Sequence, residues 1–308
     1  MKIAVTGSHG LVGTALLRRL RADGHEVVRL VRYGSAGGEQ AGIRWDPSSG
    51  TIEAERLEGL DAVVHLAAKN IGDGRWTPAR KEELVRSRVT GTGLLARTLA
   101  ELDRPPPVLL SASAVGWYGD RGDQLVTEAS GPGTGFFAEL CRDWEDATAP
   151  ASDAGIRVTH LRSGVVLSPE GGMLAKLLPF FRLGLGGRLG SGRQYLAWIF
   201  LDDEIAAIRF LLDHQLAGPV NLTSPEPVTN RVFTAALARV LRRPAIVPIP
   251  LFGPKLLYGS ELVEETIVPS QRVVPERLLD AGFGFAHPDI EQALRSVLDR
   301  DGPAADAA

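Results

Sequence analysis

The sequence is poor in cysteine and in any pattern typical of metal binding. Its 308 residues include one cysteine, Cys141, so no internal disulfide can form, as expected in a reducing compartment. The 6 histidines are scattered without the spacing of metal ligands, and we predict no metal site. Disulfide-stapled and metal-centred classes of protein are therefore excluded.

An excess of charge of one sign and a long apolar run are also missing. The net charge is −3 with both signs mixed along the chain, which argues against a nucleic-acid partner. No apolar run approaches the roughly 20 residues of a membrane span. Lys2 is followed at once by an apolar strand pattern, so we expect no signal peptide. We expect a cytoplasmic protein without nucleic-acid or membrane partners.

Glycine, by contrast, is present in an ordered pattern at the start of the chain. Residues 1–20, MKIAVTGSHGLVGTALLRRL, read as an apolar strand, a turn with three evenly spaced glycines, and an amphipathic helix. Such a turn brings backbone N–H groups and a helix N-terminus to a pyrophosphate. A glycine-rich surface turn is the alternative. We predict a dinucleotide site formed by Gly7, Ser8, His9, Gly10, Leu11, Val12 and Gly13.

The next predicted strand, residues 26–32 (EVVRLVR), indicates which dinucleotide binds. Sites for NAD usually end this strand with Asp or Glu, whose carboxylate bonds the ribose 2′-OH. Here the position holds Arg32, and a guanidinium suits a 2′-phosphate instead. A solvated arginine at a strand end is the alternative. We predict NADP(H) in preference to NAD(H).

Strands and helices alternate through the first two thirds of the chain. Strands are predicted at 42–46, 61–68, 108–113 and 155–162, with a long helix from Pro78 to about Asp103 that Thr77 caps. This alternation predicts a doubly wound parallel sheet, an α/β fold of the Rossmann type. Small or polar residues at the strand ends are expected beside the cofactor: Leu66, Ala67, Ala68, Ser111 and Arg162.

Several phrases of the sequence resemble one known family. TGSHGLVG, DAVVHLAA, SASAVGWYG and LRSGVVLSP follow the order of the extended short-chain dehydrogenase/reductases. IGDGRWTPARK, FFAELCRDWE, GGRLGSGRQYLAWI and RVVPERLLDAGFGF are similar to a narrower, atypical group, the SulA-like proteins of the NAD-dependent epimerase/dehydratase family. The resemblance covers nearly the whole chain.

The resemblance implies two interleaved domains. We expect an NADP-binding Rossmann domain at 1–168, to which 198–226 returns. A smaller substrate-side C-terminal domain is expected at 169–197 and 227–300, and a disordered tail at 301–308. The partner implied is a small-molecule substrate, and the oligomeric state is left open.

The family's usual proton relay is not found in the sequence. In the family a Ser polarises a substrate oxygen, and a Tyr-x-x-x-Lys motif transfers the proton while the Lys lowers the Tyr pKa. Ser113 fits the first role. In the register set by Glu145, a family-like helix Glu, Phe137 and Cys141 stand at the Tyr and Lys positions. Buried residues of one helix face are the alternative interpretation of this pair.

Other side chains are candidates for the missing chemistry. Tyr118 is our first substitute proton donor, placed near the mouth of the cleft, and Lys81 is the second. Either residue has a purely structural alternative. Four further residues are candidates for substrate contacts: Arg75, Trp76, Arg193 and Tyr195. The glycine-rich segment 184–192 is expected to form a flexible flap, and Phe200 replaces a histidine common in relatives.

These observations predict an NADP(H)-dependent oxidoreductase or epimerase-like enzyme acting on a small polar molecule. The alternative is a non-catalytic NADP(H)-binding regulatory or sensor protein, since a disabled relay beside an intact fingerprint fits that function as well.

Overall fold

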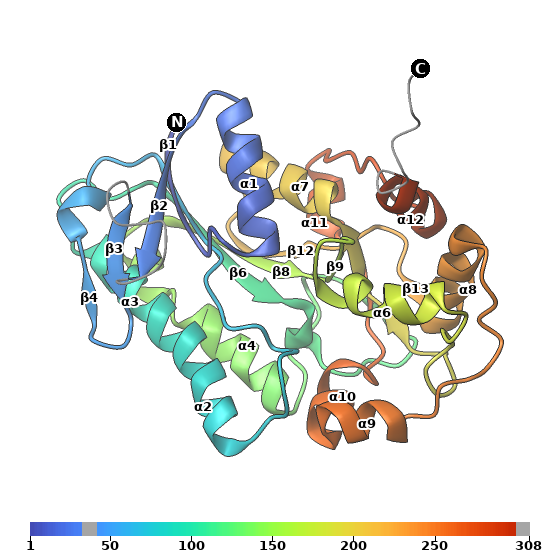
Figure 1. Cartoon of the computed structure of the whole chain (residues 1–308). Helices are drawn as coiled ribbons and strands as arrows, with labels where there is room; N and C mark the ends of the chain where they lie inside the picture. The colour runs from blue at the N-terminus through green and yellow to red at the C-terminus, as the bar shows by residue number, and fades with distance from the viewer. Residues whose placement is uncertain (33–41, 300–308) are drawn as a thin grey trace.

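A mostly parallel sheet runs through the centre of the computed structural model, which describes residues 1–32 and 42–299 (Figure 1). The strand order is β12-β8-β6-β5-β1-β2-β3-β4, and only the β3–β4 pair is antiparallel. The strands are β1 (Lys2–Thr6), β2 (Glu26–Arg32), β3 (Ile43–Asp46), β4 (Thr51–Ile52), β5 (Ala62–His65), β6 (Val108–Ala114), β8 (Arg157–Ser163) and β12 (Gly218–Leu222). The predicted doubly wound α/β fold is confirmed.

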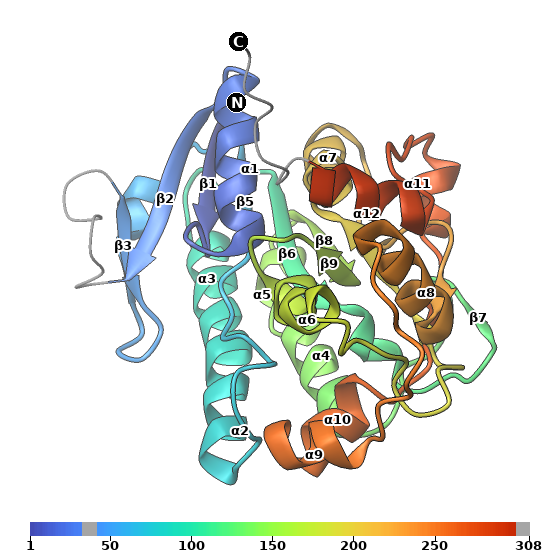
Figure 2. The same cartoon turned by 45° about the vertical axis from the view of Figure 1, so that its right-hand side comes forward.

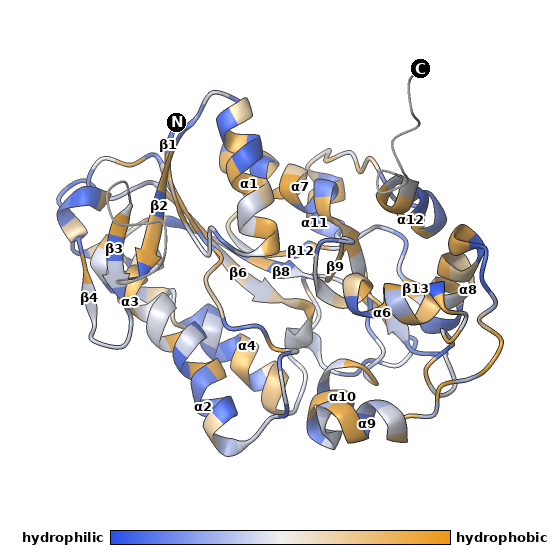
Figure 3. Ribbon diagram, viewed as in Figure 1, coloured by the Kyte–Doolittle hydropathy of each residue, from blue (hydrophilic) through white to orange (hydrophobic). Residues whose placement is uncertain are grey.

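Helices cover both faces of this sheet, which explains why its central strands are almost continuously apolar. Alternate residues of a strand point to opposite faces of the sheet and pack into two separate cores. Ile3 and Val5 pack under the helices of one face, and Ala4 packs under the helices of the other. Figure 3 shows much of β1 and β2 in the hydrophobic colour, whereas the end of β6 is pale. The first layer holds α1 (Leu11–Ala22) and α7 (Leu201–Asp213). The second holds α2 (Pro78–Val85), η2 (Arg86–Thr90), α3 (Gly91–Ala100), α4 (Phe136–Asp146) and α5 (Ala149–Asp153).

The predicted long helix after Thr77 is observed with one interruption. The Thr77 hydroxyl accepts from the backbone N–H of Arg80 over 3.2 Å, which caps α2 as expected. Between α2 and α3 the chain forms η2, a π-helical turn, in which Arg88 is buried. Such a wide turn within an α-helix is uncommon.

A third core, distinct from the two on the faces of the sheet, is built from the C-terminal half of the chain, which Figure 2 shows beside the sheet. Phe181, Trp198, Phe200 and Phe233 are among its buried residues. Because Trp198 and Phe200 belong to the segment expected to return to the Rossmann domain, the domain boundaries stay a prediction. The remaining helices are α6 (Gly172–Arg182), α8 (Asn230–Leu241), α9 (Phe252–Tyr258), α10 (Ser260–Thr266), α11 (Glu276–Asp280) and α12 (Ile290–Asp299), with short turns η1 (Ala54–Leu57) and η3 (Val115–Tyr118).

Short strands complete this region: β9 (Val165–Leu167) pairs with β11 (Trp198–Phe200), β10 (Tyr195–Leu196) with β13 (Val228–Thr229), and β7 (Leu125–Val126) with β14 (Arg272–Val273). No helix among the described residues is both long and apolar enough to cross a membrane. The predicted tail at 301–308 lies outside the described residues.

Candidate functional site

The glycine turn between β1 and α1 has the geometry of a phosphate-binding loop. Gly7 has a φ of +64°, and a Cβ there would lie 2.6 Å from the carbonyl carbon of Leu66. A Cβ on Gly13 would lie 2.2 Å from the carbonyl oxygen of Gly7. Gly10 forms the N-cap of α1, and no side chain caps the helix there. The start of α1 therefore offers its N–H groups to an external anion.

The strand order reverses between β1 and β5, the position at which open α/β sheets bind ligands. The Thr6 hydroxyl accepts from the N–H groups of Leu66 and Ala67 over 3.0 and 3.1 Å, which holds this segment beside the glycine turn. His65 contacts Thr6 (2.8 Å) and Thr92 (3.0 Å) through its two ring nitrogens. Burial lowers the pKa of His65 to about 4, so it is a neutral structural residue.

Two arginines of β2 lie at this edge of the sheet. Arg32 ends the strand and is exposed, as a phosphate ligand needs to be. Sequence reasoning missed Arg29, which donates through Nε to the Ser8 hydroxyl (3.2 Å) and through Nη2 to Nε2 of His9 (2.7 Å). The available signal was an arginine inside an otherwise apolar strand. The glycine turn is therefore flanked by positive charge on its β2 side.

Ser113, Glu145 and Arg162 form a buried polar network. The Ser113 hydroxyl donates to Oε1 of Glu145 over 2.6 Å. Arg162 donates to the same carboxylate through Nε (2.8 Å) and Nη2 (2.7 Å), a bidentate pair. The β6–β8 register sets Ser113 opposite Arg162, and none of the three is more than 8 % exposed. In the sequence, Glu145 served only to align the family motif. In the structure its carboxylate accepts from both Ser113 and Arg162 and so connects the network.

His160 borders the same carboxylate. Its Nδ1 lies 3.6 Å from Oε2 of Glu145, and its Nε2 contacts the Thr148 hydroxyl at 2.9 Å. Burial lowers the pKa of His160, which favours the neutral ring.

Arg162, expected at the cofactor, is engaged with protein groups. Ser111 is buried, and its hydroxyl has no hydrogen-bond partner among the described residues.

Tyr118 is fully buried, so its expected position at the cleft mouth is wrong. The η3 turn directs its ring inward, where the hydroxyl donates to Oδ1 of Asn221 (2.7 Å) and accepts from Nη1 of Arg162 (3.0 Å). Burial raises the pKa of the phenol. The Tyr118 hydroxyl therefore serves the buried network and is unsuited to donating a proton to a ligand.

Phe137 and Cys141 are packing residues of α4. The Phe137 ring lies against Gly116, where an added Cβ would lie only 2.3 Å from its Cε1 atom. Cys141 is fully buried, and burial raises the pKa of its thiol to about 12. Neither side chain exchanges a proton near neutral pH.

The predicted proton donor Lys81 and the predicted substrate contacts Arg75 and Trp76 are all engaged with protein groups, and two of them reach the C-terminal helices. Arg75 donates to the carbonyl of Leu256, and Lys81 pairs with Glu261. Trp76 is buried and donates through Nε1 to the Ile71 carbonyl over 3.0 Å. Their positions are set by contacts with α9 and α10, or by packing, which the local sequence does not reveal. Trp76 is therefore unavailable to a ligand, whereas Arg75 stays exposed.

The remaining two candidates lie nearer the glycine-rich segment. Arg193 is exposed, whereas Tyr195 is half-buried with the Arg272 guanidinium 5.4 Å from its ring centre. The segment itself is anchored: Leu189 N–H donates to Oδ1 of Asn230 (2.8 Å), and residue 190 N–H donates to residue 249 C=O (3.0 Å). These hydrogen bonds tie the segment to α8 and to residue 249, and its flexibility stays a prediction.

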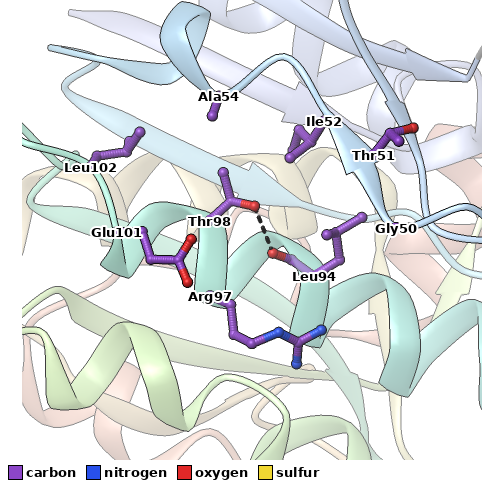
Figure 4. Close-up of a pocket in the computed structure, with 9 residues that line it drawn as sticks. All are labelled: Gly50, Thr51, Ile52, Ala54, Leu94, Arg97, Thr98, Glu101 and Leu102. Atoms are coloured by element: carbon purple, nitrogen blue, oxygen red, sulfur yellow. Dashed lines mark hydrogen bonds between the residues drawn. The ribbon is translucent and has the colours of Figure 1, made fainter.

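A separate hollow of about 480 Å³ lies between β4 and α3 (Figure 4). It is lined by Gly50, Thr51, Ile52, Ala54, Leu94, Arg97, Thr98, Glu101 and Leu102. None of these is an expected site residue. Within the described ranges, no group of three or more metal-ligating side chains converges.

Known proteins are similar to this chain over almost its whole length. The family model described as "NAD dependent epimerase/dehydratase family" matches residues 3–253, and a domain of unknown function, DUF1731, matches 249–297. An epimerase family protein of Mycobacterium bovis is 46 % identical over 97 % of this chain and 98 % of that protein.

Two solved structures add to these similarities. The crystal structure of the human epimerase family protein SDR39U1, with NADPH, has a TM-score of 0.88 at 31 % identity, covering 97 % of this chain and 99 % of that one. A nucleoside-diphosphate sugar epimerase of Corynebacterium glutamicum has a TM-score of 0.77 at 40 % identity, covering 97 % of this chain and 58 % of that one. Because the family model matches most of the chain and the Mycobacterium bovis protein is 46 % identical to it, the chain belongs to the NAD dependent epimerase/dehydratase family.

Proposed function

We propose that the protein binds NADP(H) and acts as an oxidoreductase or epimerase-like enzyme on a small polar substrate. The glycine turn and the uncapped start of α1 support dinucleotide binding. Arg32, with Arg29 and His9 nearby, supports a 2′-phosphate on the adenosine ribose. The NADPH in the human SDR39U1 structure supports the same choice.

Each part of the dinucleotide has an assigned partner in this proposal. The backbone of residues 7–13 holds the pyrophosphate, and Arg32 holds the 2′-phosphate. Leu66, Ala67 and Ala68 follow β5 and lie under the cofactor. When bound, the nicotinamide supplies the site for hydride transfer.

The hydrogen bond from Ser113 to Glu145 carries the enzymatic part of the proposal. Because the hydroxyl hydrogen points at Oε1 of Glu145, the remaining Ser113 lone pairs accept from a donor. Ser113 therefore orients a substrate hydroxyl, which loses its proton while the carbon that bears it gives a hydride to the oxidised nicotinamide. Since Phe137 carries no phenol and Tyr118 is buried, water or another non-standard group takes that proton.

A non-catalytic NADP(H)-binding sensor is the second candidate. The packing roles of Phe137 and Cys141 favour it, because α4 lacks the usual acid while the glycine turn is intact. The fold does not separate the two functions, since one scaffold hosts many chemistries.

Titration of NADPH and NADH against the wild type, Arg32→Ala and Arg104→Ala tests cofactor binding. Arg104 is an exposed arginine far from the glycine turn in sequence and serves as the control. We expect NADPH to bind more tightly than NADH, and Arg32→Ala to weaken NADPH about tenfold or more while sparing NADH. Absence of binding by either cofactor would overturn the proposal.

Turnover then separates enzyme from sensor. Nicotinamide absorbance is followed with a panel of sugar nucleotides and small alcohols, for the wild type and Ser113→Ala. A substrate-dependent change that Ser113→Ala abolishes supports the enzyme, whereas NADPH binding without turnover across the panel supports the sensor.

A further inference from the structure

Arg88 is a buried cation for which the described residues supply no carboxylate. It lies in η2 and is 5 % exposed. Its Nη2 donates to the Lys69 carbonyl over 2.9 Å. The contact from Nη1 to the Leu84 carbonyl is long at 3.5 Å, and Nε has no hydrogen-bond partner among the described residues. Burial lowers the pKa of the guanidinium to about 10, which leaves it charged at neutral pH. A buried charge so poorly paired destabilises the free protein, so a further acceptor is expected.

The guanidinium of Arg88 lies where η2 packs against α4; α2 and α3, the helices before and after η2, are labelled beside α4 in Figures 1 and 2. It is 4.9 Å from the Trp144 ring centre and lies close to the Cys141 thiol of the same helix. The Cys141 thiol in turn contacts the backbone of Ala114, the last residue of β6. Arg88 thus lies beside the C-terminal ends of β5 and β6, near Ser113.

The sheet order assigns this place to one half of a bound dinucleotide. Arg32, at the end of β2, marks the adenosine half on one side of the β1–β5 reversal. The pyrophosphate turn touches Leu66 through Gly7, and from Leu66 the chain leads to Lys69, whose carbonyl Arg88 holds. The nicotinamide half therefore extends over β5 and β6, toward Arg88.

We infer that Arg88 binds the nicotinamide ribose, with its guanidinium N–H groups donating to the ribose oxygens. This inference rests on the proposed dinucleotide binding. An arginine fork presents several donors and no acceptor, which suits a pair of ribose oxygens. Cys141 of α4 stands at the position of the family's lysine, but its thiol is a weak donor and carries no charge. In this proposal the positive charge beside the ribose is therefore that of Arg88 in η2.

Calorimetric titration with two probes tests the inference: NADPH, and 2′,5′-ADP, which lacks the nicotinamide riboside. The variants are Arg88→Met, Arg88→Lys and, as a matched control on the same turn, Arg86→Met; Arg86 is exposed. We expect Arg88→Met to weaken NADPH about tenfold or more and to leave 2′,5′-ADP unchanged. Arg88→Lys, which keeps the charge, should recover part of the loss, and Arg86→Met should match the wild type.

Denaturant unfolding distinguishes binding from a structural role. Because Arg88→Met removes a poorly paired buried cation, its unfolding midpoint should not fall. Unchanged NADPH affinity, or equal weakening of both probes, would overturn the assignment of Arg88 while leaving dinucleotide binding intact. If the wild type binds neither probe, the proposed function fails, and the inference fails with it. Should Arg88→Met not fold, Arg88→Lys still decides between these outcomes through the ratio of the two affinities.

Discussion

The hydroxyl of Ser113 and Oε1 of Glu145 lie 2.6 Å apart, and the same carboxylate receives two nitrogens of Arg162. Both oxygens of Glu145 are therefore occupied by donors, and the hydrogen of Ser113 is directed away from any ligand. This arrangement gives Ser113 a fixed orientation at the end of β6. It also places Glu145, a residue of α4, at the centre of the network.

Glu145→Ala should lower the free energy of unfolding by about 3 kcal/mol or more, because Arg162 is left buried and unpaired. Urea unfolding followed by circular dichroism measures the change. The control is Glu26→Ala, whose partner Lys2 is largely exposed; we expect less than about 1 kcal/mol there. Equal losses of unfolding free energy in the two variants would show that the buried network contributes no more to stability than the exposed ion pair. The double variant Glu145→Ala/Arg162→Met should recover part of the loss.

Glu204 gives the stability a specific pH dependence. It is fully buried, Oε1 accepts from the Ser163 hydroxyl (2.6 Å), Oε2 has no partner, and burial raises its pKa to about 8. In the unfolded chain the pKa is about 4.3. Between these two values the folded state holds the extra proton, so the contribution of Glu204 to stability is full at low pH and falls as pH rises toward 8.

Glu204→Gln should therefore become more stable relative to the wild type as pH increases from 5 to 8, with little further change above 8. The slope of the difference approaches about 1.4 kcal/mol per pH unit. Unfolding midpoints of both proteins from pH 5 to 9 measure it. Comparing the two proteins cancels the effect of His65, whose lowered pKa acts below about 6.5 in both. A pH-independent difference would contradict the buried, protonated state of Glu204.

The Cys141 thiol should be unreactive in the folded protein. It is fully buried, and its pKa of about 12 leaves almost no thiolate at pH 8. Since it is the sole cysteine of the chain, a colorimetric thiol reagent reports on it alone. We expect labelling only after denaturant is added, at the rate of unfolding or slower. Rapid labelling of the native protein would show that α4 opens or that the thiol is accessible.

Much of the fold was predictable because local and global signals agree. Ile3 and Val5 belong to a strand buried on both faces, which requires an almost continuous apolar run. The turn that follows needs glycine at positions where a Cβ would meet backbone atoms. Thr77 and Pro78 mark a helix start by their own chemistry.

The side-chain partners of the site were less accessible to sequence reasoning. Lys81 and Glu261 are 180 residues apart, and their pairing depends on how α10 packs against α2. The direction of Tyr118 depends on the η3 turn, which lacks a strong sequence signal. The burial of Arg88 depends on the packing of η2 against α4. Contacts of this kind arise from tertiary packing and leave no local pattern.

Gly10 and Gly13 should respond differently to the same substitution. A Cβ on Gly13 would lie 2.2 Å from the Gly7 carbonyl oxygen, whereas at Gly10 that oxygen would be 3.3 Å away. Gly10 also has φ −75°, which alanine adopts readily. Gly13→Ala should therefore lower both stability and NADPH affinity, because the turn must shift. Gly10→Ala should change the free energy of unfolding by less than about 1 kcal/mol yet weaken NADPH strongly, since its methyl group stands where the pyrophosphate approaches the backbone. Paired unfolding and NADPH titrations measure both quantities. Tight NADPH binding by a folded Gly10→Ala variant would show that the ligand does not lie on this turn.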